Sequence, residues 1–374
     1  MTDAPIPESL VWVLVPTMPS ADEHLQYYGD YEQSRGELAR AFDALGLDWR
    51  WQPVTLDSVG AVVADVLSGP AQPAPVVLNL CDGDEHQGVP GISVIDELEA
   101  AGLAYTGAGR AFYHATTSKI EMKRAFDHAR VPTAPWAIVH DQLTDWHAPF
   151  QRPGRPLLVK PSVSAGSLGI SVENVVDTPE QLASRVQALT RGYHGWDFTA
   201  GGLFAEEFIV GREYTTFIVG DYDDEPHRRI YPPVERVFHE ALPPTEQFLS
   251  FDRLWEFYDK ESPLPDGEYL WEYARVPDEA SARIEAISWA AYVAVGGVGY
   301  GRVDLREDAM TGDLYVLEVN AQCGLSEDEN YTSIGAILKF ANASFASLIA
   351  QLLAHARRRP HTRSRRAART VAIA

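Results

Sequence analysis

Short apolar runs alternate with helical stretches over the first third of the chain. The run LVWVLVP (10–16) stops at a proline and predicts a buried strand, whereas GELARAFDALG (36–46) has helical spacing and closes on a glycine. The same signals return in PVVLNL (75–80), PGISVIDELEAAG (90–102) and LAYTG (103–107). Because strands that alternate with helices indicate a parallel sheet, we expect an N-terminal α/β unit.

From residue 116 onward the pattern turns to β-rich segments interrupted by a few helices. Apolar residues recur at helical spacing in 116–129, 179–189, 278–295 and 331–356. The strand-like segments are PLLVK, ISVENVV, LFAEEFIV, GREYTTFIVGD, YGRVDLR and LYVLEVN. The polar, proline-rich stretch 232–277 is expected to be mostly loop.

These segments divide the chain into an N-terminal α/β domain (1–115), a central α+β unit (116–210) and a C-terminal α+β unit (211–356). The remainder, 357–374, is rich in arginine and poor in apolar residues, which is typical of a disordered tail. A basic tail could contact RNA or an acidic partner, but a solvated terminus is the favoured interpretation.

The charge balance limits the partners. The 374 residues carry 31 Lys and Arg against 53 Asp and Glu, a net charge of −22, so nonspecific binding to nucleic acid or to an anionic membrane is unfavourable. Only two cysteines occur, Cys81 and Cys323, which argues against a disulfide framework. Since no signal segment and no long uninterrupted apolar stretch stands out, we expect a cytoplasmic protein.

The segment VKPSVSAGSLGIS (159–171) sets Lys160 before a run of small residues. A Walker A loop needs the lysine after its glycines, and the β-branched ISVENVV that follows argues against the strand-to-helix turn of a serine hydrolase around Ser167. The segment therefore predicts a hairpin with a Gly/Ser tip. Backbone N–H groups there, together with the lysine, suit a polyphosphate. An ordinary mobile hairpin is the alternative.

A second glycine motif, TGAGRA (106–111), resembles the start of a dinucleotide fingerprint. Phe112 replaces the third glycine, and no acidic residue follows at the usual distance. We interpret this motif as a strand-to-helix turn.

Two later strands carry paired polar residues on one face. Arg302 and Asp304 lie two apart in GRVDL, as do Glu318 and Asn320 in LEVN. Two adjacent strands can therefore present carboxylate and amide oxygens beside an arginine, a donor set that suits Mg²⁺. The same alternation also fits half-exposed strands with a structural ion pair. Two such pairs near a phosphate-loop candidate favour the metal site.

Taken together, the chain resembles the ATP-grasp enzymes, and within them the D-alanyl-D-alanine ligase-like branch. The resemblance covers about residues 76–340 and rests on segments that follow the family's order, namely VLNLCDGDEHQGVPGISVIDELEAAGLAYTG, TTSKIEMK, VKPSVSAGSLGIS, FAEEFIVGREYT, YGRVDL and LEVNAQCG. It implies an ATP-grasp fold of class α/β (α+β), in which two α+β subdomains clasp ATP behind an N-terminal parallel α/β domain. ATP and Mg²⁺, with Mn²⁺ as a substitute, are the implied cofactors.

The resemblance also assigns roles to individual residues. The implied metal ligands are Asp304, Glu318 and Asn320, and Arg302 resembles the catalytic arginine that stabilises the oxyanion. The implied ATP-binding residues are Lys119 and Lys160 at the phosphates, Gly166 and Ser167 at the tip of the covering loop, Glu206 and Ile209 at adenine, and Glu213 at the ribose.

The substrate segments depart from the family pattern. The family's glycine-rich turn with its amine-binding glutamate is replaced by a longer aromatic stretch (16–36), in which Glu32 and Asp30 are the substitutes. Cys81 stands where the family has a histidine. Lys260 is the nearest residue to the phosphate lysine of the family's mobile loop, but it is not a clear match.

After LEVN, the acidic segment LSEDENYTS (325–333) replaces the one that carries the family's substrate-binding serine, and Ser333 is the displaced candidate. Its side chains Glu327, Asp328 and Glu329 either attract an amine or guanidinium or form a solvated loop.

We therefore expect an ADP-forming ligase that joins a carboxylate to an amine through an acyl phosphate. The substrates would be amino acids or similar small molecules other than a D-alanine pair, with a role in natural-product or peptide tailoring. A true D-alanyl-D-alanine ligase and a nucleotide-binding module without ligase activity are the alternatives. The expected partners are small molecules rather than nucleic acid or a membrane, and a homodimer is the candidate assembly.

Overall fold

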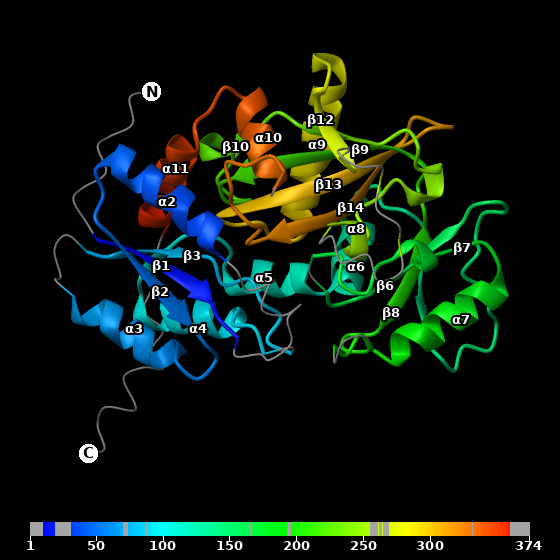
Figure 1. Cartoon of the computed structure of the whole chain (residues 1–374), viewed down its shortest axis with the longest axis horizontal. Coiled ribbons are helices and arrows are strands. Elements are labelled where there is room, and N and C mark those ends of the chain that lie inside the picture. Colours follow the sequence, from blue (N-terminus) through cyan, green and yellow to red (C-terminus); the bar gives the residue numbers. More distant parts are fainter. Residues whose placement is uncertain are drawn as a thin grey trace.

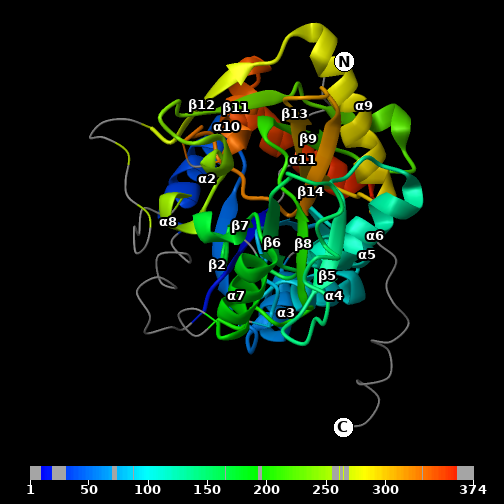
Figure 2. The same ribbon diagram turned by 90° about the vertical axis from the view of Figure 1, so that its right-hand side faces the viewer.

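A computed structural model describes residues 10–18, 31–69, 74–86, 88–164, 166–192, 196–254, 261, 264, 269–330 and 332–359. Three sheets are arranged along the molecule, from the N-terminal sheet through a large antiparallel sheet to a smaller one that carries α7 (Figures 1 and 2). Asp30, Lys260 and residues 360–374 of the predicted tail lie outside the described residues.

The N-terminal sheet is parallel, as predicted, with the order β2-β1-β3-β4. Its strands are β1 (Val11–Pro16), β2 (Trp49–Val54), β3 (Val76–Asn79) and β4 (Ala104–Tyr105). Helices α3 (Val59–Ser68) and α4 (Ile92–Ala101) pack with Trp12 and Leu14, whereas α2 (Glu32–Leu45) packs with Val11, Val13 and Val15. Successive β1 side chains thus enter opposite cores, which explains the unbroken apolar run. Strand β2 and helix α3 were not predicted.

The smaller sheet is antiparallel, with the order β5-β8-β6-β7. Its strands are β5 (Trp136–Val139), β6 (Leu157–Pro161), β7 (Val175–Val176) and β8 (Leu203–Glu207), and α7 is Pro179–Thr190. The predicted hairpin exists, because β6 pairs with β7. Its second strand is shorter than expected, since Val172–Asn174 form the 3₁₀ turn η1.

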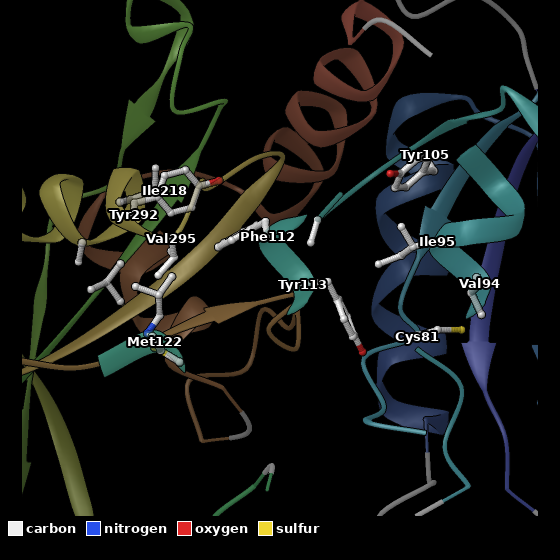
Figure 3. Packing of buried hydrophobic residues seen from close by; sticks show 14 of the residues in the cluster. Cys81, Val94, Ile95, Tyr105, Phe112, Tyr113, Met122, Ile218, Tyr292 and Val295 are labelled. Atoms are coloured by element: carbon white, nitrogen blue, oxygen red, sulfur yellow. The ribbon is translucent and has the colours of Figure 1, made fainter. Parts of the chain in front are cut away.

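The predicted helix 116–129 corresponds to the end of one helix and the whole of a second. Helix α5 (Arg110–Thr117) ends at Ser118, whose extended backbone breaks the helix and whose hydroxyl accepts a hydrogen bond from the Glu121 N–H at the start of α6 (Lys119–Ala129). Phe112 of α5 packs edge to face on Tyr292, with ring centroids 5.2 Å apart, while Tyr113 turns toward Cys81 and Ile95 (Figure 3). Helix α5 therefore joins the core of the N-terminal sheet to that of the large sheet.

The large sheet has the order β12-β11-β9-β13-β14, with β10 paired to β9. Its strands are β9 (Gly211–Val219), β10 (Arg229–Ile230), β11 (Val234–Phe238), β12 (Trp271–Arg275), β13 (Tyr300–Asp308) and β14 (Leu314–Ala321). Helix α9 (Asp278–Ala294) follows β12, and the short elements are η2 (Glu225–His227), η3 (Pro244–Glu246) and α8 (Phe251–Leu254). The expectation of mostly loop over 232–277 is wrong at both ends, where β11 and β12 pair and extend the sheet.

The predicted helix 331–356 is also two helices, α10 (Ser333–Phe340) and α11 (Phe345–Arg358), bent by 102° relative to each other. Asn342 between them has a left-handed backbone, and the Ser344 hydroxyl caps α11. Helix α11 packs back on α2 and β3, so the chain's end completes the core of the N-terminal sheet. No single helix among the described residues is long and apolar enough to cross a membrane; only this bent pair passes that test jointly. The domain boundaries stay a proposal.

Candidate active site

Strands β13 and β14 bring the predicted metal ligands together. Asp304 lies directly opposite Glu318, and Arg302 lies opposite Asn320. The Asn320 amide nitrogen is 3.0 Å from both Asp304 Oδ2 and Glu318 Oε1, and Arg302 Nε is 3.1 Å from both oxygens of Asp304. The four side chains therefore form one continuous polar cluster, as the two-residue spacing predicted.

This cluster fits a hard divalent cation. Burial alone would raise the pKa of Glu318, but Lys119 and Lys160 bring it down to about 2, so the carboxylate is ionised. A half-turn of the Asn320 amide exchanges its nitrogen for its oxygen, which places three oxygen donors around one point. Two carboxylates and an amide suit Mg²⁺ or Mn²⁺ completed by phosphate oxygens. The described part of the chain has no group of three or more His, Cys, Asp or Glu residues placed to bind a metal.

Lys119 connects this cluster to the smaller sheet. Its ammonium lies 3.6 Å from Glu318 Oε2 and donates to the Ser164 carbonyl at 2.8 Å, in the loop that follows β6. Gly166 and Ser167 follow with left-handed backbones, at φ 56° and 61°. The predicted phosphate loop and the predicted metal ligands therefore flank one lysine.

Lys160 lies on β6 and faces Glu206 on β8, at 2.7 Å from Oε1. Lys123 binds the other carboxylate oxygen at 2.5 Å, and both Lys123 and Glu206 are only 2% exposed. The two ammonium groups lower the Glu206 pKa against the opposing effect of burial. Lys123 was missed, although the spacing of four residues in KIEMK places it on the same helical face as Lys119.

Glu213, the predicted ribose ligand, lies in a buried ionic network. Arg306 Nε is 3.1 Å from its Oε2, and Arg236 binds its other oxygen. These guanidinium groups lower the Glu213 pKa although burial raises it. Arg306 also donates to the Ile209 carbonyl at 2.9 Å, which ties the predicted adenine segment to β13. Any ribose contact must therefore share a carboxylate that already accepts two arginines. Both arginines were missed, although Arg306 continues the alternation of Arg302 and Asp304.

The acidic segment after β14 is held by basic side chains. Glu327 lies 2.7 Å from Arg40 of α2, and Glu329 lies 2.9 Å from Lys339 of α10. Buried Glu37 accepts hydrogen bonds from the Ser326 hydroxyl at 2.9 Å and from the Glu327 N–H at 3.0 Å. Asp328 accepts hydrogen bonds from the Gln33 amide at 3.1 Å and from the Asn330 N–H at 2.9 Å. All three acidic groups thus have protein partners, which weakens the idea that they attract a substrate amine.

Glu32 and Ser333, the candidates to replace the family's substrate-binding glutamate and serine, lie in different surroundings. Glu32 lies in the first turn of α2, where its side chain is 80% exposed and pairs with Arg35 at 3.7 Å. Ser333 begins α10, and the hydroxyls of Thr332 and Ser333 are buried without a hydrogen-bond partner. Unpartnered hydroxyls at a helix N-terminus suit a carboxylate, so Ser333 stays a candidate whereas Glu32 is poorly placed.

Comparisons with known proteins match the chain to ligases. A family model described as the C-terminus of D-ala D-ala ligase matches residues 126–354. The chain belongs to the D-alanine–D-alanine ligase family. The D-alanine–D-alanine ligase of Xanthomonas axonopodis pv. citri is 30% identical over 295 residues, covering 78% of this chain and 80% of the relative. That of a Psychrobacter species is 29% identical over 231 residues, and the match spans 61% of this chain and 60% of the relative.

The fold agrees with this membership. The structure of D-alanine–D-alanine ligase from Bacillus anthracis complexed with ATP superposes with a TM-score of 0.63, covering 94% of this chain and 98% of that one at 17% identity. A second structure of that protein gives a TM-score of 0.65. The predicted ATP-grasp fold and the enzyme class of ATP-dependent, ADP-forming ligases are confirmed.

Proposed function

We propose that the chain ligates two molecules of D-alanine in an ATP- and Mg²⁺-dependent reaction. The similar ligases described above are D-alanine–D-alanine ligases, which favours this pair over other amino acids. The expectation of a different substrate pair, with a role in natural-product or peptide tailoring, rests on the altered substrate segments alone. The acidic segment after β14 now has a simpler explanation, since Glu327, Asp328 and Glu329 all have partners within the protein.

One observation carries the proposal. Lys119 touches both the loop after β6 and Glu318 of the β13–β14 cluster, so groups suited to phosphate and to a divalent cation converge on one point. Arg302 lies at the edge of that cluster, where it pairs with Asp304 at 2.9 Å. This combination supports phosphoryl transfer to a carboxylate rather than nucleotide binding alone.

The reaction has two steps. A carboxylate oxygen of the first amino acid attacks the γ-phosphorus of ATP, the bond to the β-phosphate oxygen breaks, and an acyl phosphate and ADP result. The amine of the second amino acid then attacks the carbonyl carbon, phosphate leaves, and the amine loses a proton. Bound Mg²⁺ would neutralise phosphate charge. Arg302 meets the oxyanion of the second step, and Lys119 and Lys160 hold the phosphates.

The residues at α10 suit the second substrate. Its carboxylate would accept hydrogen bonds from the buried hydroxyls of Thr332 and Ser333, which have no partner within the protein. The Gly166–Ser167 loop tip would cover the phosphates and keep water from the acyl phosphate.

The test is incubation of the purified protein with ATP, Mg²⁺ and D-alanine alone, followed by measurement of ADP and of the dipeptide by mass spectrometry. We expect ADP and D-alanyl-D-alanine in equal amounts. ADP release with another amino-acid pair, but not with D-alanine, would restore the original expectation of a different substrate. Binding of ATP without amino-acid-dependent ADP release, across a panel of D- and L-amino acids, would contradict ligase activity.

A further inference from the structure

The strand order of the N-terminal sheet reverses at β1, and the residues assigned so far do not explain this feature. In the order β2-β1-β3-β4, the chain leaves β1 toward one side for β2 and then crosses to the other side for β3. Ligands of open parallel sheets bind at such a reversal, beyond the carboxyl ends of the strands. Asp82 follows the end of β3 by three residues and therefore stands at this reversal of the strand order.

The carboxyl end of β3 lies beside the end of β14. Gln322, just past β14, donates to the Asn79 carbonyl at 2.9 Å and accepts from the Ala108 N–H at 2.7 Å. Burial is the main cause of the raised pKa of its neighbour, the Cys323 thiol; Arg302 opposes this rise, and Asp304 and Asp82 add to it. Asp82 and the catalytic arginine candidate therefore lie around the same cysteine.

Within the part of the chain that the structure describes, Asp82 has no counter-ion. Among the described residues, no side chain donates a hydrogen bond or forms an ion pair to its carboxylate. Its negative charge adds to burial in raising the pKa values of the Cys81 and Cys323 thiols and of the Tyr113 and Tyr300 phenols. Burial raises the Asp82 pKa to about 7. Such a carboxylate gains most from a cation that enters with a ligand.

We propose that Asp82 binds the ammonium group of the amino acid whose carboxylate is activated beside Arg302. This inference rests on the proposed function and names the residue that recognises the first substrate. An α-ammonium is adjacent to its own carboxylate, so in this proposal one amino acid would bind Asp82 through its ammonium and Arg302 through its carboxylate. The second amine is a poor occupant, because it must be neutral to attack and a carboxylate would stabilise its protonated form.

Hydroxylamine trapping isolates this step, since the acyl phosphate reacts with hydroxylamine, releases phosphate and leaves a hydroxamate without a second amino acid. The substrates are D-alanine and propionate, which has the carboxylate but no ammonium. The wild-type protein should prefer D-alanine. Asp82→Asn should lower kcat/KM for D-alanine by at least about tenfold, the loss expected for a charge-assisted hydrogen bond, and leave propionate unchanged. Asp82→Glu should recover part of the preference.

Asp57→Asn serves as the control, because Asp57 is an exposed acid in the loop between β2 and α3. This variant should behave as wild type. Calorimetric titration of each protein with D-alanine, in the presence of a non-hydrolysable ATP analogue and Mg²⁺, separates binding from turnover. D-alanine binding that disappears in Asp82→Asn supports the inference even if the wild type forms no ADP, in which case only the proposed ligase function fails. An Asp82→Asn variant that keeps the full preference for D-alanine, or a wild type that binds no amino acid, overturns it.

Discussion

The Lys119 ammonium lies 3.6 Å from Glu318 Oε2, although the two residues belong to different layers of the molecule, α6 and β14. The same ammonium donates to the Ser164 carbonyl beside the phosphate-loop candidate. A nucleotide held by this loop would therefore extend its phosphates toward the carboxylates of β13 and β14. The ligase proposal depends on this one connection between the sheets.

The first prediction concerns the paired carboxylates of β13 and β14. Asp304→Asn and Glu318→Gln each remove one charged oxygen donor, so affinity for Mn²⁺ in the presence of an ATP analogue should fall at least about tenfold. Electron paramagnetic resonance titration of free Mn²⁺ measures this change. Asp313→Asn, an exposed acid on the same hairpin, is the control and should bind as the wild type does. Unchanged Mn²⁺ affinity in the variant that carries both substitutions would exclude this metal site.

Arg302 should act in turnover rather than in nucleotide binding. Arg302→Ala removes the guanidinium that would meet the oxyanion, so kcat should fall by about 10²- to 10³-fold while ATP affinity is retained. Steady-state ADP release and calorimetric ATP titration measure the two quantities. Arg302→Lys, which keeps the charge but not the planar fork, should be intermediate. If ATP affinity falls in parallel with kcat, the arginine has a structural role; if kcat is unchanged, the protein is not using it for catalysis.

Glu206 should be important for stability, because it is the carboxylate between two lysines. Glu206→Gln leaves Lys123 and Lys160 without their shared counter-ion, and Lys123 is buried. Loss of one partner of a buried ion pair costs about 3–5 kcal/mol in the free energy of unfolding. Chemical denaturation measures this cost, with the exposed Glu180→Gln on α7 as the control. Adding Lys123→Met should restore part of the loss, and a Glu206→Gln variant as stable as the control would argue against the pairing.

Asp82 should make stability pH-dependent in a defined direction. Its pKa is about 7 in the folded protein, above the ordinary value near 3.9, so the fold favours the protonated carboxyl. The wild type therefore loses stability as the pH rises from about 4 to 7. The neighbouring thiols and phenols of Cys81, Cys323, Tyr113 and Tyr300 have raised pKa values and stay uncharged over this interval. Asp82→Asn lacks the effect.

Thermal denaturation of the two proteins across this interval provides the measurement. The melting temperature of Asp82→Asn should exceed that of the wild type above pH 7, and the difference should shrink toward pH 4. A difference that is constant with pH, or that grows in acid, would contradict a raised pKa at Asp82.

Features that depend on local alternation could be predicted from the sequence. The spacing of Arg302 with Asp304 and of Glu318 with Asn320 fixed their common faces, and the structure adds only that the strands are neighbours. The Gly/Ser loop was likewise visible as a hairpin tip. A half-buried strand leaves its period of two in the sequence whatever it packs against.

Features that depend on distant partners could not be predicted. The residues next to Glu213 in the sequence do not indicate that Arg236 and Arg306 bind it, because these contacts arise from the register of three strands. The same holds for β11 and β12, whose short polar sequences become strands through pairing. The bend before α11 brings this helix onto α2 and β3, a contact that an apolar helical pattern does not encode. Asp82 became a candidate only when the sheet order was known.

The most direct measurement of the central claim follows oxygen atoms. If ATP activates the carboxylate at the β13–β14 cluster, D-alanine labelled with ¹⁸O in its carboxylate must transfer one labelled oxygen to inorganic phosphate in each ligation. Mass spectrometry of the phosphate released with ATP and Mg²⁺ should therefore show one ¹⁸O for each ADP formed. Phosphate that contains no ¹⁸O, while ADP and dipeptide accumulate, would contradict the acyl-phosphate account.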